Sequence, residues 1–138
     1  MSKSNVVAVL GRVFSEHAAG HSENVSVALP CKVLSFNADT LTASVQPLLK
    51  LSNAEPAPIS SVPVIGQHFK FSLDLGNGLR EYETIMRPVL KRGDTVFVVC
   101  ADAEIKNTLT GKVAAPDTAR RHSRNDAVIV GVFPCSLL

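Results

Sequence analysis

The chain is poor in aromatic residues and in cysteine. Its 138 residues include no Trp, one Tyr, six Phe and three Cys. Barrels that bind single-stranded nucleic acid normally present stacking aromatic side chains, so this shortage counts against such a function. Cys31, Cys100 and Cys135 are odd in number and form no C-x-x-C pair, and the first two lie in apolar runs where a thiol packs as a small hydrophobe. We therefore expect a reducing site of synthesis.

Charge of one sign and long hydrophobic runs are also scarce. Fourteen basic and twelve acidic residues give a net charge of +2, too little for a chain built to neutralise a polyanion. No apolar run has the length needed to cross a bilayer, and Gly11, Arg12 and Glu16 interrupt the first segment, unlike the core of a signal peptide. We expect a soluble protein made in a cytoplasm.

What the chain does contain suits a single β-rich domain. Its length allows one hydrophobic core without metal or disulfide staples. It is 46% hydrophobic and 19% charged, with eight Gly and eight Pro, a composition richer in apolar and turn residues than that of a helical bundle.

Residues 4–17 have the spacing of an amphipathic helix, with Ser4 or Asn5 as the N-cap. We expect Gly20 to end this helix and residues 20–24 to form a linker. Two positions for the helix remain open, against its own barrel or against a partner. The candidate partner contacts are the side chains of its apolar stripe, Val6, Leu10, Val13 and Phe14.

From Val25 onward the apolar spacing changes to two residues, which is typical of strands. Residues 67–87 predict one long hairpin around Gly76-Asn77-Gly78, and Pro47 must end a strand, form a bulge or lie at an edge. The remaining strand candidates are residues 27–36, 40–46, 59–65, 95–100 and 127–133, of which the last two are apolar on both faces and predict central core strands.

About five principal strands without alternating helices predict a mainly β fold, a small five-stranded OB-fold-like antiparallel barrel with an N-terminal amphipathic helix and an extended β-hairpin. An SH3-like barrel is the main competitor. The expected organisation is a helix and linker at residues 1–24 and a barrel at residues 25–138.

Signatures of catalysis are weak or missing. There is no G-x-S-x-G, P-loop or dinucleotide motif. His17 and His21 are four residues apart but lack a third ligand, and Cys100 with His122 is better explained by packing than by a nucleophile and its base. The basic run at residues 120–124 is best explained as a solvated or salt-bridged loop. We expect no enzyme activity, no metal and no cofactor.

Several segments in order carry a resemblance to a known family. They are Ala28–Val33, Ala43–Lys50, Val62–Val64, Arg87–Asp94 and Ala119–Ala127, which include a Val-Gln-Pro stretch, a Lys-x-Gly-Asp turn and an Arg-His-x-x-x-Asp-Ala run. Together they resemble the N-terminal OB-fold domain of phage membrane-puncturing spike proteins, over roughly residues 25–133. The matching residues are scaffold rather than site residues: Pro30, Gln46, Pro47, Gly93, Asp94, Arg121, His122 and Asp126. We expect Asp126 to anchor the Arg121–His122 loop by a charge-assisted bond.

The resemblance implies a homotrimeric collar in the baseplate of a contractile phage tail, made in the host bacterial cytoplasm. The tail hub protein would lie above it and a needle below it, so that membrane contact is only indirect. The chain stops at Leu138 without the repetitive β-helix and metal-stabilised tip of the family, which implies a separate needle chain or a truncated domain. The long hairpin is a second departure and a candidate contact arm. The alternative function is a single-stranded nucleic-acid-binding OB-fold protein.

Overall fold

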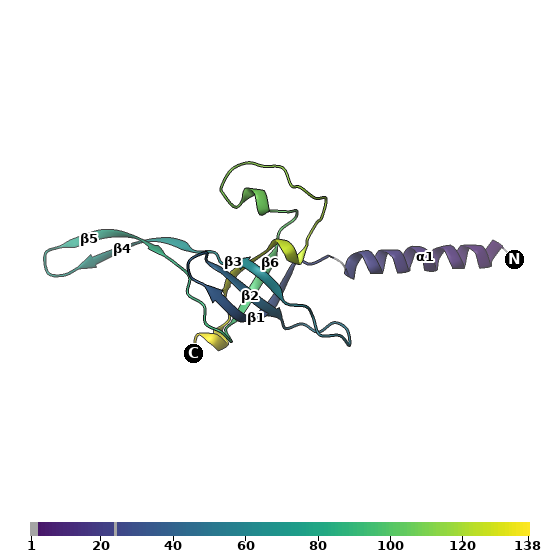
Figure 1. Cartoon of the computed structure of the whole chain (residues 1–138), viewed down its shortest axis with the longest axis horizontal. Coiled ribbons are helices and arrows are strands. Elements are labelled where there is room, and N and C mark those ends of the chain that lie inside the picture. Colours follow the sequence, from purple (N-terminus) through teal and green to yellow (C-terminus); the bar gives the residue numbers. More distant parts are fainter. Residues whose placement is uncertain (1–2, 24) are drawn as a thin grey trace. The chain divides into compact units, whose positions relative to one another are not determined.

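The computed structural model describes residues 3–23 and 25–138, and side chains at residues 5–15 and 25–138. It contains two compact units, which are described separately here: residues 1–27 with 100–126, and residues 28–99 with 127–138. The elements labelled in Figure 1 and the remaining strand are α1 (Lys3–Glu23), β1 (Ala28–Asn37), β2 (Thr42–Pro47), β3 (Ile59–Pro63), β4 (Gln67–Asp74), β5 (Leu79–Met86), β6 (Thr95–Cys100) and β7 (Ala127–Val132).

Helix α1 is longer than the sequence predicted. It begins at Lys3 and continues past Gly20 to Glu23, so the expected helix end at Gly20 and the linker over residues 20–23 were wrong. A glycine inside a helix costs only about 1 kcal/mol and ends the helix only where the chain turns away after it. Asn24 lies outside the described residues.

The second unit is a curled antiparallel sheet with the strand order β3-β2-β1-β6-β7. Val64, just after β3, forms a parallel bridge with Ile129 of β7, and the amide of Ile65 donates to the carbonyl of Ile129 at 3.1 Å. The two ends of the sheet therefore approach each other, which leaves little free strand edge. This mainly β, OB-like barrel confirms the predicted fold class.

The barrel core is made by alternate residues of its strands. In β2 every second residue is buried, and Val33 of β1 lies opposite Val45 of β2. Pro47 is the last residue of β2, as its missing N–H required. The core side chains of this unit are Leu29, Cys31, Val33, Ala43, Val45, Ile59, Val62, Leu90, Val96, Val98, Ala127 and Ile129.

Strands β6 and β7 are apolar on both faces but are buried on only one. Phe97 of β6 is 37% exposed and Val130 of β7 is 46% exposed. The prediction that both strands are central was right for β6, which lies between β1 and β7, whereas β7 is last in the strand order. A single-layer barrel buries only its inward residues, so its outward apolar residues stay exposed unless another element covers them.

Strands β4 and β5 form a second sheet of their own, the hairpin predicted for residues 67–87. Their register runs from Gln67 opposite Met86 to Asp74 opposite Leu79. Gly76 and Gly78 at the tip have φ angles of 103° and 96°, and the amide of Gly76 donates to the Asp74 side chain at 2.8 Å. These are the positive φ values that the Gly-Asn-Gly sequence predicted.

Candidate interaction surfaces and a buried ion cluster

Helix α1 presents an apolar stripe to solvent. Val6, Leu10, Val13 and Phe14, the predicted partner contacts, are all exposed, and Phe14 is 71% exposed. Their spacing of three and four residues places them along one side of the helix. Exposed apolar side chains gathered on one side of a helix form a candidate contact surface.

The β4–β5 hairpin has two chemically different faces. Residues directly opposite each other in an antiparallel pair point to the same side. The residues of one face, which we call the apolar hairpin face, are Gln67, Phe69, Phe71, Leu73, Arg80, Tyr82, Thr84 and Met86. The residues of the opposite face are His68, Lys70, Ser72, Asp74, Leu79, Glu81, Glu83 and Ile85. Every residue of both strands is exposed.

The apolar hairpin face has a stacked aromatic pair at its centre. The rings of Phe71 and Tyr82 lie 5.6 Å apart between centroids with an interplanar angle of 24°. On the opposite face, Lys70 forms an ion pair with Glu81 at 2.8 Å. One face of the hairpin is thus mainly apolar, whereas the other has most of the charged side chains together with exposed Leu79 and Ile85.

The proline and glutamine scaffold residues fix the loop that follows β2. The carbonyl of Pro30 accepts a hydrogen bond from the amide of Leu48 at 3.0 Å. The Gln46 amide nitrogen donates to the carbonyl of Pro56 at 2.6 Å and to that of Pro47 at 3.3 Å. Their contacts hold the loop after β2 rather than form a site.

Gly93 and Asp94 form a tight turn before β6. Gly93 has a φ of 94°, and the Asp94 carboxylate accepts from the amide of Lys91 at 2.8 Å. The same pair exchanges backbone hydrogen bonds of 2.8 Å with Val33. A positive φ favours glycine here, which explains the Lys-x-Gly-Asp motif by backbone geometry.

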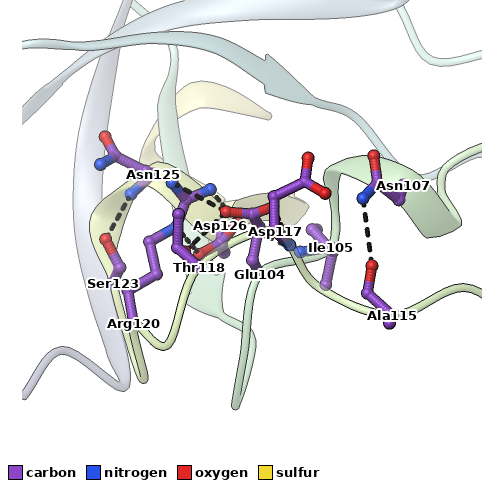
Figure 2. Close-up of polar contacts among 10 residues, drawn as sticks. All are labelled: Glu104, Ile105, Asn107, Ala115, Asp117, Thr118, Arg120, Ser123, Asn125 and Asp126. Carbon is purple, nitrogen blue, oxygen red and sulfur yellow. Dashed lines mark hydrogen bonds and ion pairs between the residues drawn. The ribbon is translucent and has the colours of Figure 1, made fainter.

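The first unit contains a buried ion cluster between the segment after β6 and the segment before β7, and Figure 2 shows its members. Arg120 donates to both carboxylate oxygens of Asp126, through Nε at 2.7 Å and through a terminal nitrogen at 2.9 Å. Its other terminal nitrogen lies 3.2 Å from Oε2 of Glu104. The guanidinium thus bridges two buried carboxylates, the geometry that arginine serves best.

Backbone and hydroxyl donors complete the cluster. Asp126 accepts from the amide of Ile105 at 3.2 Å, while Glu104 accepts from the Thr118 hydroxyl at 2.7 Å and from the amide of Asp117 at 3.0 Å. The hydrogen bond from Arg120 holds the pKa of Asp126 below its ordinary value against the effect of burial. The Thr118 and Asp117 hydrogen bonds lower the pKa of Glu104.

Asp126 anchors its loop, as predicted, but through Arg120 rather than through Arg121 or His122. Arg121 is exposed. His122 has a φ of 45°, and its Nε2 lies 3.8 Å from the exposed carboxylate of Asp102. The sequence of residues 117–126 does not indicate which of its arginines has a buried ion pair.

Cys100 does not have the surroundings of a catalytic nucleophile. The side chain is buried, and burial raises the pKa of its thiol, which keeps the thiol protonated.

Among the described residues, no group of three or more His, Cys, Asp and Glu side chains is placed to hold a metal ion. The side chains of His17 and His21 lie outside the described residues. In the described part of the chain, no helix has the length and apolarity that a membrane span requires.

The comparison with known families agrees with the barrel. The family described as phage protein Gp138 N-terminal domain matches residues 29–131, about three quarters of the chain. The chain belongs to the Gp138 N-terminal domain family. This membership confirms the resemblance given by the sequence segments and makes the chain a phage structural protein. No curated protein matches the sequence.

The family match covers the barrel, the hairpin and the ion cluster, and α1 precedes it. Sequence reasoning missed Glu104 and gave Arg120 only as part of a solvated or salt-bridged loop, and the structure shows Arg120 in salt bridges with Glu104 and Asp126. Glu104 is only 6% exposed, which is rare for a glutamate without a partner. No periodicity of the sequence relates the three positions of the cluster, so no sequence signal identifies them as partners.

Proposed function

We propose that the chain is the trimeric collar of a contractile phage tail baseplate. In this proposal three barrels form a ring that binds the tail hub protein on one side and a separate needle or tip protein on the other. The membrane is reached by the needle, so the collar itself contacts it only indirectly. The protein acts by connecting parts and has no catalytic role.

The observation that carries the proposal is the combination of a Gp138-type barrel with exposed apolar side chains on α1 and on the hairpin. The barrel lies within the family match, whereas the α1 stripe and the apolar hairpin face are exposed. Soluble monomers rarely leave such contiguous apolar surface uncovered, and surfaces of this kind mark contacts with other proteins. Assembly into a larger particle supplies those contacts.

The buried ion cluster fixes the long segment between β6 and β7. It ties residues 104 and 117–126 into one hydrogen-bonded group, so the long segment between β6 and β7 is held at several points. Removing one member of a buried ion group leaves an uncompensated charge, which makes the arrangement specific. A contact that repeats head to tail and closes after three copies then gives a ring.

Nucleic-acid binding receives less support from the same residues. Within the basic run at residues 120–124, Arg120 is engaged by two carboxylates and is therefore not free to neutralise phosphate. The aromatic pair of the hairpin stacks on itself. A single-strand-binding barrel needs both free cations and open aromatic faces along one groove.

The proposal is tested on particles of the phage that encodes the chain. Quantitative mass spectrometry of purified virions should find three copies for each tail, and gold-labelled antibodies should mark the baseplate end. Absence from the virion, or labelling along the whole tail, contradicts the collar. Retention on single-stranded DNA that weakens steeply as salt rises would instead favour the nucleic-acid alternative.

A further inference from the structure

We propose that the apolar hairpin face is an interface between copies of this chain, covered in the assembled protein by the same face of the neighbouring copies. This inference rests on the proposed trimer and adds to it the surface by which the copies meet. In a ring of three, the hairpins would turn their apolar faces toward the threefold axis and their polar faces toward water.

The hairpin needs a partner to be stable. A two-stranded sheet alone in water is marginal at best, and both of its outer strand edges are open to pairing with other chains. Each strand of this hairpin is exposed along its whole length, so the described barrel gives it no support. The hairpin therefore gains stability from a partner, and another copy of the chain is present wherever the chain is made.

The charge distribution favours a copy of the same face over a partner of opposite charge. A surface that packs on its own copies brings each of its charges near an identical one, so it must be almost uncharged. The apolar hairpin face contains one charged residue, Arg80, at the end of the hairpin nearest the tip. The other face contains Lys70, Asp74, Glu81 and Glu83, which would repel their own copies.

The area of the face is sufficient for contact between copies. Its five large apolar side chains are between 39% and 53% exposed: Phe69, Phe71, Leu73, Tyr82 and Met86. At about 200 Å² for a fully exposed side chain of this size, they offer roughly 400–500 Å² per copy. Two such faces together approach the ~1,000 Å² that a specific interface needs, before any contact between barrels is added.

The test compares two substitutions on neighbouring residues of one strand. Phe71→Glu places a carboxylate at the centre of the apolar face, and Ser72→Glu places the same charge on the polar face. We expect the purified wild-type chain and Ser72→Glu to have the mass of three chains by light scattering, and Phe71→Glu to have the mass of one. Circular dichroism checks that the barrel of both variants is folded.

A second measurement leaves the aromatic pair intact. In a Cys135→Ser background, in which the remaining cysteines are buried, Thr84→Cys puts a thiol on the apolar face and Glu83→Cys puts one on the polar face. A short bis-maleimide should link chains through Cys at residue 84 and not at residue 83. Equal linking at both positions, or none at residue 84, overturns the inference.

The outcomes separate this inference from the proposed function. A wild-type trimer that Phe71→Glu leaves intact overturns the hairpin contact and keeps the collar, with the face then left for the hub protein. A wild-type dimer that Phe71→Glu dissociates keeps the hairpin contact and overturns the trimer. A wild-type monomer contradicts both.

Discussion

At the scale of single residues, Asp126 links more of the first unit than any scaffold residue named from sequence. Its carboxylate joins Arg120 to the amide of Ile105, and its backbone carbonyl accepts from the amide of Ala101 at 2.9 Å. The side chain is only 1% exposed. The family motif at this position is therefore explained by the need to fix a loop.

Asp126→Asn should lower the free energy of unfolding by about 2 kcal/mol, because one carboxylate oxygen that accepts from Arg120 is replaced and the guanidinium keeps only Glu104 as a charged partner. Chemical denaturation at a fixed chain concentration measures the change. Asp102→Asn is the matched control, since this carboxylate is 89% exposed. The control should change stability by less than about 0.5 kcal/mol. Equal effects of the two substitutions would contradict a special role for the cluster.

The same cluster predicts a loss of stability in acid. The pKa values of Asp126 and Glu104 are lowered on folding. A lowered pKa stabilises the folded chain above the unfolded pKa, and this contribution disappears as the pH falls through the folded value. Stability should therefore be nearly constant from about pH 7 to pH 5 and should fall below about pH 4.

Asp126→Asn should make this acid dependence shallower, because one of the two carboxylates no longer titrates. Denaturation of wild type and variant across the same pH series gives the comparison. Parallel curves would show that other carboxylates cause the loss in acid.

The sequence predicted the roles of residues whose identity is required by the local backbone conformation. Proline at a strand end and glycine at a positive φ have one local explanation each, so Pro47 and Gly93 were found without a structure. The Glu104–Arg120–Asp126 cluster joins three loop positions that no periodicity relates. Which arginine turns inward depends on the tertiary path of the loop.

At the scale of elements, the helix and the hairpin expose several large apolar side chains each, and the outer faces of β6 and β7 expose Phe97 and Val130. A free helix in water gains little from propensity alone, so α1 needs a surface to pack on. That surface is either its own barrel or a neighbouring protein. The spacing of apolar residues in α1 is the same in both cases, so a substitution in the helix is needed to distinguish them.

Leu10→Glu should weaken assembly or hub binding at least about tenfold, because burying an unpaired carboxylate costs more than 1.4 kcal/mol. Ser15→Glu adds the same charge on the opposite side of α1, where it meets water. Light scattering measures assembly, and co-purification with the hub protein of the same phage measures binding. If Leu10→Glu leaves both unchanged, the helix does not contact a partner.

Element boundaries followed from sequence wherever a period of two was clear. The hairpin and the paired strands β1 and β2 lie within two residues of their predicted limits. The end of α1 was missed because glycine tolerates helix as well as turn. The burial of β6 and β7 was overestimated because a single-layer barrel buries only the inward side of a strand, even where both sides are apolar.

At the scale of the whole molecule, the barrel fold and the family are established, and the role in the tail is a proposal. Barrel topology could be predicted because strand number and the absence of alternating helices leave few solutions. Partners could not, because the proposed function depends on surfaces of other chains, which this sequence does not contain. In the proposal, one surface forms the interface between the three copies, one binds the hub protein and one binds the needle protein.

The mass of the purified chain in solution at moderate salt is the most direct test of the trimeric collar. The account predicts three times the 14.7 kDa chain mass, unchanged when the salt concentration is raised. A stable monomer across the micromolar range would contradict it.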